Sequence, residues 1–259
     1  MNASHPSASR GSALRVEGLG LQIGGATILE DVDLDIPAGS VVGVIGPNGA
    51  GKTTLFNVIS GLVRPTAGRI VLDDRDITSV AVPARARAGL GRTFQTSSLF
   101  PKLTVLENVR LAAQVSIGGD YSLFRFPRRT DAATRLALGK LDAVGLAHKA
   151  DSLAGDISHG DKRKLEIAVL LATEASLVLL DEPMAGVASG DVAGLVESIR
   201  VMQREKGCTV LMVEHHIDVL MGLVDKVAVM YFGTIIAFDT PQNVMANPTV
   251  QSAYLGTAA

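Results

Sequence analysis

The sequence lacks three features that would each point to a particular class of protein. It contains one cysteine, Cys208, so it has no internal disulfide and no cysteine pair for a metal site; we interpret this residue as a small core side chain. No apolar run reaches the length of a membrane span, because polar residues interrupt even the run at 167–180. The net charge of −2 disfavours a large nucleic-acid-binding surface.

The remaining composition is that of a soluble globular protein. With 259 residues, 47% of them hydrophobic and 19% charged, the chain can bury one large α/β core or two modest units. Residues 1–13 are rich in Ser, Ala and Gly and have no apolar core, which predicts a flexible tail and not a secretory signal. Residues 257–259 are predicted to be a short C-terminal tail. We therefore expect a cytosolic protein.

The most informative stretch is a glycine-rich motif at 46–53, which reads GPNGAGKT and fits the phosphate-binding pattern G-x-x-x-x-G-K-[ST]. The apolar run at 41–45 before it predicts a buried strand, and a helix is expected to begin at Thr54. This strand–loop–helix context favours a nucleoside triphosphate site over an ordinary glycine-rich turn. The predicted nucleotide-binding residues are Gly46, Pro47, Asn48, Gly49, Ala50, Gly51, Lys52, Thr53 and Thr54.

The chemistry of this motif follows from its residue types. The glycines allow successive backbone N–H groups to point inward at phosphate oxygens, with the positive end of the helix dipole behind them. Lys52 supplies a positive charge to the β- and γ-phosphates, and the hydroxyl of Thr53 suits Mg²⁺. The sequence therefore predicts binding of ATP or a similar nucleotide together with Mg²⁺.

Hydrophobic patterning predicts an α/β fold. Short alternating runs at 14–36 are typical of an antiparallel sheet, whereas strands that alternate with helices in the rest of the chain imply a mainly parallel sheet covered on both faces. A segment rich in Gly, Pro and charges at 116–130 is predicted to be an insertion. The expected strands are 69–72, 91–94, 177–180, 209–213 and 227–231, and the expected helices are 105–115, 131–144, 162–171 and 192–202.

Two acids, Asp181 and Glu182, follow the predicted strand at 177–180. Adjacent residues on a strand point in opposite directions, so the two carboxylates can do different jobs at the end of the sheet where ligands bind. Asp181 suits the Mg²⁺ shell and Glu182 suits the orientation of a water. Alone, this pair would indicate a solvated strand end. Beside a phosphate loop, it indicates phosphoryl transfer.

Three further segments complete a recognisable order: Gln95, the run ISHGD at 157–161, and His215 after the predicted strand at 209–213. With the phosphate loop and the acidic pair, this order resembles that of the ATP-binding cassette (ABC) ATPases over residues 14–256. The resemblance implies a P-loop NTPase of ABC type. Such a fold has a RecA-like core, an N-terminal antiparallel β subdomain and an inserted helical subdomain, here at roughly 96–172.

The resemblance also implies roles for individual residues. Gln95 would contact Mg²⁺, and His215 the γ-phosphate, while the adjacent His216 is left with a structural role. Glu182, His215 and Lys52 would be the catalytic residues, and Thr53, Gln95 and Asp181 the metal ligands. Ser158, Gly160 and Asp161 would close over the ATP of a second ABC subunit in a head-to-tail dimer, since Ser158 suits the N-cap of a helix. Leu99 and Phe100 are predicted to be exposed and to form a docking surface for a transmembrane partner.

The chain departs from the family pattern at three places. Ile23 stands where an aromatic side chain normally stacks on adenine, so the base is expected to pack against an aliphatic residue. His159 replaces a glycine of the signature motif, and Asp161 replaces a glutamine. The loop at 185–189 reads AGVAS, where the family often carries a carboxylate or amide followed by proline. These departures predict altered contacts at the signature and altered communication between two sites.

Several segments resemble one branch of the family, the ATPases of branched-chain (hydrophobic) amino-acid importers: GRTFQ at 91–95, LEIA at 165–168, VEH at 213–215 and AYLG at 253–256. We therefore predict an ATP-hydrolysing subunit at the cytoplasmic face of the membrane. Its expected partners are a second ABC ATPase subunit, identical or different, transmembrane permease subunits and, indirectly, a solute-binding protein. A urea or amide importer and a lipid exporter remain alternatives. A soluble ABC protein acting on nucleic acid or the ribosome is disfavoured, because the chain has neither a second cassette nor an excess of positive charge.

Overall fold

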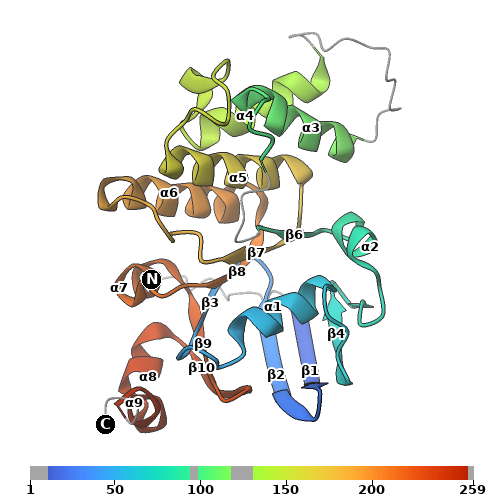
Figure 1. The fold of residues 1–259 in the computed structure, drawn as a ribbon, viewed down its shortest axis with the longest axis vertical. Helices are drawn as coiled ribbons and strands as arrows, with labels where there is room; N and C mark the ends of the chain where they lie inside the picture. The colour runs from blue at the N-terminus through green and yellow to red at the C-terminus, as the bar shows by residue number, and fades with distance from the viewer. Residues whose placement is uncertain (1–10, 94–98, 118–130, 256–259) are drawn as a thin grey trace, which may run out of the picture.

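A computed structural model describes residues 11–93, 99–117 and 131–255 (Figure 1). Its centre is a six-stranded sheet in the order β10-β9-β3-β8-β7-β6. The neighbouring pairs from β9 to β6 are parallel, and β10 pairs with β9 in the antiparallel sense. The prediction of a mainly parallel sheet is confirmed. The strands are β3 (Val41–Ile45), β6 (Leu90–Arg92), β7 (Leu177–Asp181), β8 (Thr209–Val213), β9 (Lys226–Tyr231) and β10 (Thr234–Asp239).

Alternate side chains of the sheet enter two different cores, as the period of a strand requires. In β3, Val41 and Ile45 join the core under the helical layer, whereas Val42 and Val44 join the core on the opposite face. Both faces are therefore buried. This explains why the strands are continuous apolar runs in the sequence.

Helices cover the first face. These are α5 (His159–Thr173), α6 (Ser189–Lys206) and α7 (Ile217–Leu223). Two further helices, α3 (Val105–Ile117) and α4 (Ala132–Ala143), pack on α5 at one end of the molecule (Figure 1). A short 3₁₀ helix, Ala147–Lys149, follows α4. Helix α3 begins with a capping box in which Thr104 and Glu107 exchange hydrogen bonds, and Asp131 caps α4.

The second face packs against α1 (Lys52–Ser60) and a separate antiparallel sheet in the order β2-β1-β4-β5. The antiparallel sheet predicted at 14–36 is confirmed as β1 and β2, and β1 begins two residues before the predicted boundary. The bounds of these strands are β1 (Ser12–Ile23), β2 (Ala26–Pro37), β4 (Ala67–Leu72) and β5 (Arg75–Asp76).

Four short α-helices were absent from the sequence prediction: α2 (Val82–Arg87), α7 (Ile217–Leu223), α8 (Pro241–Ala246) and α9 (Pro248–Leu255). Helix α2 is held by Arg85, which is buried and donates hydrogen bonds to the carbonyl oxygens of Val58 at 2.9 Å and Ile59 at 2.6 Å. These acceptors are carbonyls in the last turn of α1, which have no partner within the helix. The arginine thus holds the C-terminal end of α1, the helix whose N-terminus follows the phosphate loop.

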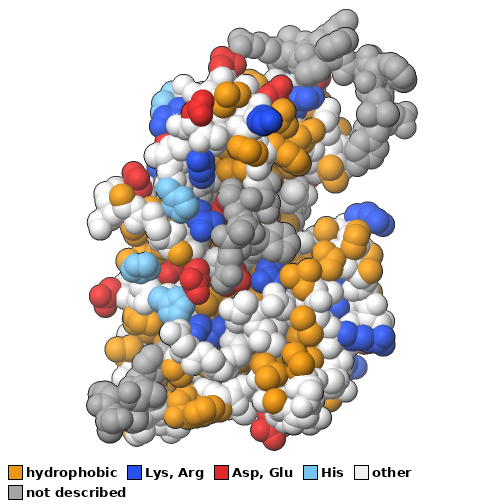
Figure 2. All heavy atoms as spheres, viewed as in Figure 1, with side chains coloured by type: hydrophobic (Ala, Val, Ile, Leu, Met, Phe, Trp, Pro, Cys, Tyr) orange, Lys and Arg blue, Asp and Glu red, His pale blue; other side chains and the backbone are white. Residues whose placement is uncertain are grey.

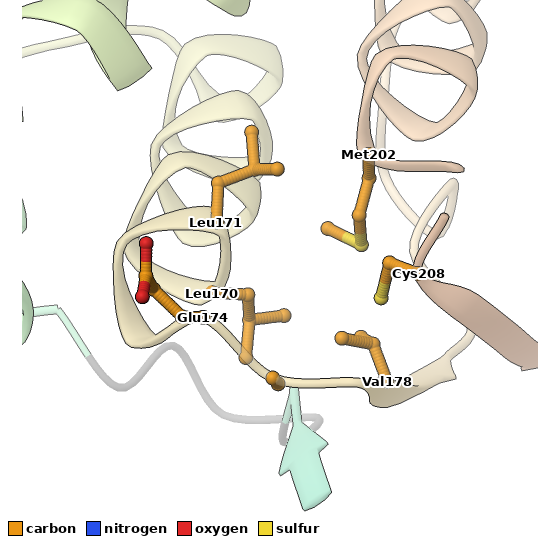
Figure 3. A pocket seen from close by; sticks show the side chains of 7 residues that line it. Leu170, Leu171, Glu174, Val178, Met202 and Cys208 are labelled. Carbon is orange, nitrogen blue, oxygen red and sulfur yellow. The ribbon is translucent and has the colours of Figure 1, made fainter. Parts of the chain in front are cut away.

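Cys208 is buried, as predicted, and lines a cavity of about 10 Å³ between α5, α6 and the sheet (Figure 3). Leu171 of α5 and Met202 of α6 face it. A space of this size holds at most one water, so it is a packing defect and not a ligand site. Among the helices in the described ranges, none combines the length and apolar character that crossing a membrane requires.

Candidate active site

The phosphate loop lies between the end of β3 and the start of α1, as predicted. A Cβ atom at Gly46 would lie 2.2 Å from the carbonyl oxygen of Met230, so this position requires glycine. Gly51 is the N-cap of α1 and has a φ of 103°, a value that favours glycine. The loop therefore has the strand-to-helix geometry that places backbone N–H groups and a helix N-terminus on one anion.

Lys52 is folded back over the loop. Its ammonium donates hydrogen bonds to the carbonyl oxygens of Gly46 at 2.7 Å and Pro47 at 3.0 Å. Burial lowers the pKa of Lys52, and the charges of Glu182 and Asp181 oppose that shift. The lysine is thus a cation near two carboxylates, held by neutral carbonyls that a phosphate group can replace. Thr53, next along the helix, is exposed.

Asp181 ends β7 and is 2% exposed. Its Oδ2 atom accepts a hydrogen bond from Arg92 at 3.1 Å, and Arg92 also donates to the hydroxyl of Ser60 at 2.6 Å. The Oδ1 atom is buried and has no hydrogen-bond partner in the part of the chain that the structure describes. Burial raises the pKa of Asp181, and the charge of Arg92 opposes the shift. Burying a carboxylate oxygen without a hydrogen-bond partner costs free energy unless a bound ligand interacts with that oxygen.

Glu182 and His215 are brought together from two strand ends. The Nε2 atom of His215 lies 2.9 Å from Oε1 of Glu182, although the residues are far apart in the chain. Glu182 has a φ of 50°, an uncommon backbone conformation for a residue with a side chain, and its N–H donates to the carbonyl oxygen of Val213. The carboxylate and the imidazole therefore lie next to each other at the C-terminal edge of the sheet.

Glu214 is a site residue that sequence reasoning missed. It is 2% exposed, and its Oε1 atom accepts a hydrogen bond from the backbone N–H of Met184 at 2.7 Å. Its Oε2 atom accepts from the backbone N–H of His215 at 3.0 Å and lies 3.3 Å from Nδ1 of His216. One carboxylate thus joins the loop after Glu182 to the loop that carries His215. The only signal in the sequence was an acid directly after a buried strand and before a histidine.

The segment at 157–161 forms the start of α5. The prediction that Ser158 caps this helix is confirmed, because its hydroxyl accepts from the backbone N–H of Asp161 at 3.2 Å. A Cβ at Gly160 would lie 2.7 Å from Oδ2 of Asp191, so α5 and the start of α6 approach closely there. The carboxylate of Asp161 pairs with Lys149.

His159, the replacement at the signature glycine, contacts the loop at 185–189. Its Nε2 atom lies 3.3 Å from the carbonyl oxygen of Ala185, and a Cβ at Gly186 would lie 3.1 Å from the same ring nitrogen. Two of the departures from the family pattern therefore touch each other. The signature segment and the loop after Glu182 are linked within one subunit.

The remaining predicted residues fall in different environments. Ile23 is 56% exposed at the end of β1, and Gln95 lies outside the described residues. Phe100 is 57% exposed, but Leu99 is half-buried and packs against the helical core. The prediction that both residues are exposed is therefore wrong for Leu99. The backbone here is fixed by Asn108, which accepts from the N–H of Phe100 at 2.8 Å, so only the side chain of Phe100 is presented to solvent.

Acidic, basic and histidine side chains gather across the middle of the face shown in Figure 2, where the strand ends lie in Figure 1. The phosphate loop follows β3, and the acids and the histidine follow from the ends of β7 and β8. A loop that cradles phosphate, a buried acid with an open oxygen and a second acid beside a histidine together suit hydrolysis of a nucleoside triphosphate.

Comparisons with known proteins agree with this geometry. The family model described as ABC transporter matches residues 29–185. The chain is 37% identical to the high-affinity branched-chain amino acid transport ATP-binding protein LivG of Escherichia coli K12 over 250 residues, which is 95% of this chain and 98% of LivG. It is 36% identical to the lipopolysaccharide export system ATP-binding protein LptB of Escherichia coli K12 over 90% of this chain and 92% of LptB.

The comparison with solved structures agrees with the match to the ABC transporter family. The crystal structure of MJ1267, an ATP-binding cassette of an ABC transporter in its ADP conformation, superposes with a TM-score of 0.82 at 32% identity, covering 95% of this chain and 99% of that one. The match thus extends beyond the motifs to the whole arrangement of strands and helices. The chain belongs to the ABC transporter family and is one of its ATP-hydrolysing, nucleotide-binding subunits.

Proposed function

We propose that this protein powers a membrane importer for branched-chain or other hydrophobic amino acids. The observation that carries the proposal is the 37% identity to LivG over 95% of the chain, together with the acids Asp181 and Glu182 and the histidine His215 at the strand ends. The subunit would act at the cytoplasmic face of the membrane, as a peripheral partner of permease subunits and, through them, of a solute-binding protein. No role in nucleic-acid binding is proposed.

The residues of the site take roles that their chemistry suits. The phosphates of ATP lie on the loop from Gly46 to Thr54, where Lys52 leaves its carbonyl partners for the β- and γ-phosphates. Glu182 polarises the attacking water, and His215, held 2.9 Å from it, stabilises charge on the transferring phosphoryl group. The proton of the water passes to the carboxylate, which general-base catalysis requires.

The residues around Asp181 fit Mg²⁺. The buried Oδ1 of Asp181 has no hydrogen-bond partner among the described residues, and a carboxylate oxygen is a ligand that this ion prefers. Thr53, Gln95 and Asp181 would hold the ion directly or through water. When bound, Mg²⁺ neutralises charge that develops on the phosphate oxygens.

The signature segment would act on a second subunit. Ser158 is exposed at the N-terminus of α5, where its hydroxyl can still donate while accepting the capping bond. With the N–H group of Gly160, it offers an anion site. In a head-to-tail dimer this site would close over the γ-phosphate bound by the partner, which is the same chain or a relative of it.

The importer proposal is tested by transport. Deleting the gene in its native cell should abolish most high-affinity uptake of radiolabelled leucine, and expression of the parent chain should restore it. The matched control is Glu182→Gln, which should be produced at the same level and restore nothing. Unchanged leucine uptake in the deletion strain would refute the proposal.

A lipid exporter remains a second candidate, because the identity to LptB is 36%. A urea or amide importer is a third alternative from the same resemblance. The deletion strain separates them, since loss of urea or amide uptake with normal leucine uptake would identify the importer alternative. Loss of surface lipid with both uptakes intact would identify the exporter.

Phe100 provides a test of permease docking. Its side chain is exposed while its backbone is fixed by Asn108, so Phe100→Ser should weaken co-purification with the permease subunits about tenfold without changing ATP affinity. Leu99→Ser, in contrast, should destabilise the helical part of the fold. Tagged-subunit pull-down and calorimetric titration with ATP measure the two effects. Unchanged assembly of the Phe100 variant would place docking elsewhere.

A further inference from the structure

One aromatic side chain near the phosphate loop is separate from the acids, the lysine and the histidine of the hydrolytic site. Phe232 lies between β9 and β10 and is 78% exposed, more than any other large apolar side chain in the described ranges. Its φ is 44°, a conformation that is unfavourable for a bulky residue. The ring meets that of Tyr231 edge to face at 4.5 Å between centroids. An apolar ring is thus presented to solvent at a conformational cost.

The turn that carries Phe232 is anchored on both sides. Gly233 donates a hydrogen bond to the carbonyl oxygen of Ala50 in the phosphate loop at 2.9 Å, and its own carbonyl oxygen accepts from the N–H of Glu30 at 3.0 Å. A Cβ at Gly233 would lie 2.5 Å from the carbonyl oxygen of Ile28. The turn is therefore clamped between the phosphate loop and β2, so Phe232 is held at the rim of the nucleotide site.

The order of the sheet gives the direction of a bound nucleotide. Strands β8 and β7, which end beside His215 and Glu182, lie on one side of β3, and β9 lies on the other. The γ-phosphate must face the hydrolytic residues, so the α-phosphate and the nucleoside extend toward β9. Ile23 is at the end of β1, which pairs with β2, and β2 contacts β10. The base thus leaves the phosphate loop on the side where both Ile23 and Phe232 lie.

We propose that the ring of Phe232 stacks on the base of the bound nucleotide and supplies the aromatic contact that Ile23 does not. This inference rests on the proposed nucleotide site. Every base has a π-face, so stacking raises affinity without choosing between adenine and guanine. The site should therefore bind GTP within roughly tenfold of ATP, because neither Phe232 nor Ile23 offers a hydrogen bond to the base.

The test compares three ligands by calorimetric titration in EDTA, which prevents turnover: ATP, GTP and inorganic tripolyphosphate. Phe232→Ala should weaken ATP and GTP binding about tenfold and leave tripolyphosphate unchanged, since that ligand has no base. Phe232→Tyr should keep the parental affinity. Met245→Ala, which removes another exposed apolar side chain, should change none of the three affinities.

A further variant tests for a gain of affinity. Ile23→Tyr should tighten ATP binding about fivefold in the parent and restore much of the loss in Phe232→Ala, because a ring at either place can stack on the base. Parental ATP affinity in Phe232→Ala, or an equal loss for tripolyphosphate, would overturn the role of Phe232. The underlying site is tested apart from it by Lys52→Ala. If that variant binds tripolyphosphate as the parent does, the proposed phosphate site itself is wrong.

Discussion

Glu182→Gln is expected to lower the rate of ATP hydrolysis by about a thousandfold while ATP affinity stays close to that of the parent. The amide has nearly the same shape and can still hold a water, but it cannot accept the proton that the water must lose. In the structure, Oε1 of Glu182 lies 2.9 Å from Nε2 of His215. An amide oxygen can keep that contact, so the substitution isolates the proton transfer from the geometry.

The measurement is steady-state phosphate release together with equilibrium ATP binding. Since hydrolysis no longer separates the subunits, gel filtration with ATP should show a stable dimer of the variant. Glu197→Gln serves as a matched control, because Glu197 is an exposed acid of α6 away from the strand ends, and its turnover should equal that of the parent. Hydrolysis by Glu182→Gln at close to the parental rate would remove Glu182 from the mechanism.

The features that could be predicted from the sequence are those with a local signal. The spacing of the glycines predicts the phosphate loop, and short apolar runs predict β3, β7 and β8. Buried strands of a parallel sheet read this way because both faces are covered. The N-cap at Ser158 was also predictable, since the hydroxyl and the N–H that it accepts from are three residues apart.

The features that could not be predicted depend on residues brought together by the fold. Arg92 reaches Asp181 across 89 positions of the chain, and no local pattern indicates that pair. Leu99 resembles an exposed loop residue in the sequence, but it packs against the helical core. The two terminal helices α8 and α9 are too short for a clear apolar period.

The contact between His159 and Ala185 shows how a departure from a family pattern can be absorbed. Sequence reasoning treated the signature and the loop at 185–189 as two separate changes. In the structure they meet, with Nε2 of His159 3.3 Å from the carbonyl oxygen of Ala185. A side chain at the signature position thus holds a loop that begins three residues after Glu182, which is a link that a glycine there could not form.

Glu214→Gln is expected to reduce kcat for ATP hydrolysis by about a hundredfold with little change in KM. The carboxylate accepts from the backbone N–H groups of Met184 and His215 through its two oxygens, and an amide can accept through only one of them. One buried donor is then left unsatisfied, and the loop that carries it shifts. A displacement of about 1 Å between catalytic groups costs roughly a hundredfold in rate. ATP binding depends instead on the phosphate loop.

Steady-state kinetics separates this positioning role from a general loss of stability, because kcat should fall while KM and the calorimetric ATP affinity remain near parental values. Urea unfolding should show a loss of about 1–3 kcal/mol, the cost of one unsatisfied buried donor, which leaves the protein folded under assay conditions. The control is His216→Asn, since His216 reaches Glu214 through an exposed ring. All three backbone N–H groups that donate to the carboxylate, those of residues 184, 215 and 216, would be kept. Equal kcat losses in the two variants would show that the imidazole of His216, and not the tie between the two loops, is what Glu214 contributes. Parental kcat in Glu214→Gln would show that the loops hold Glu182 and His215 together without it.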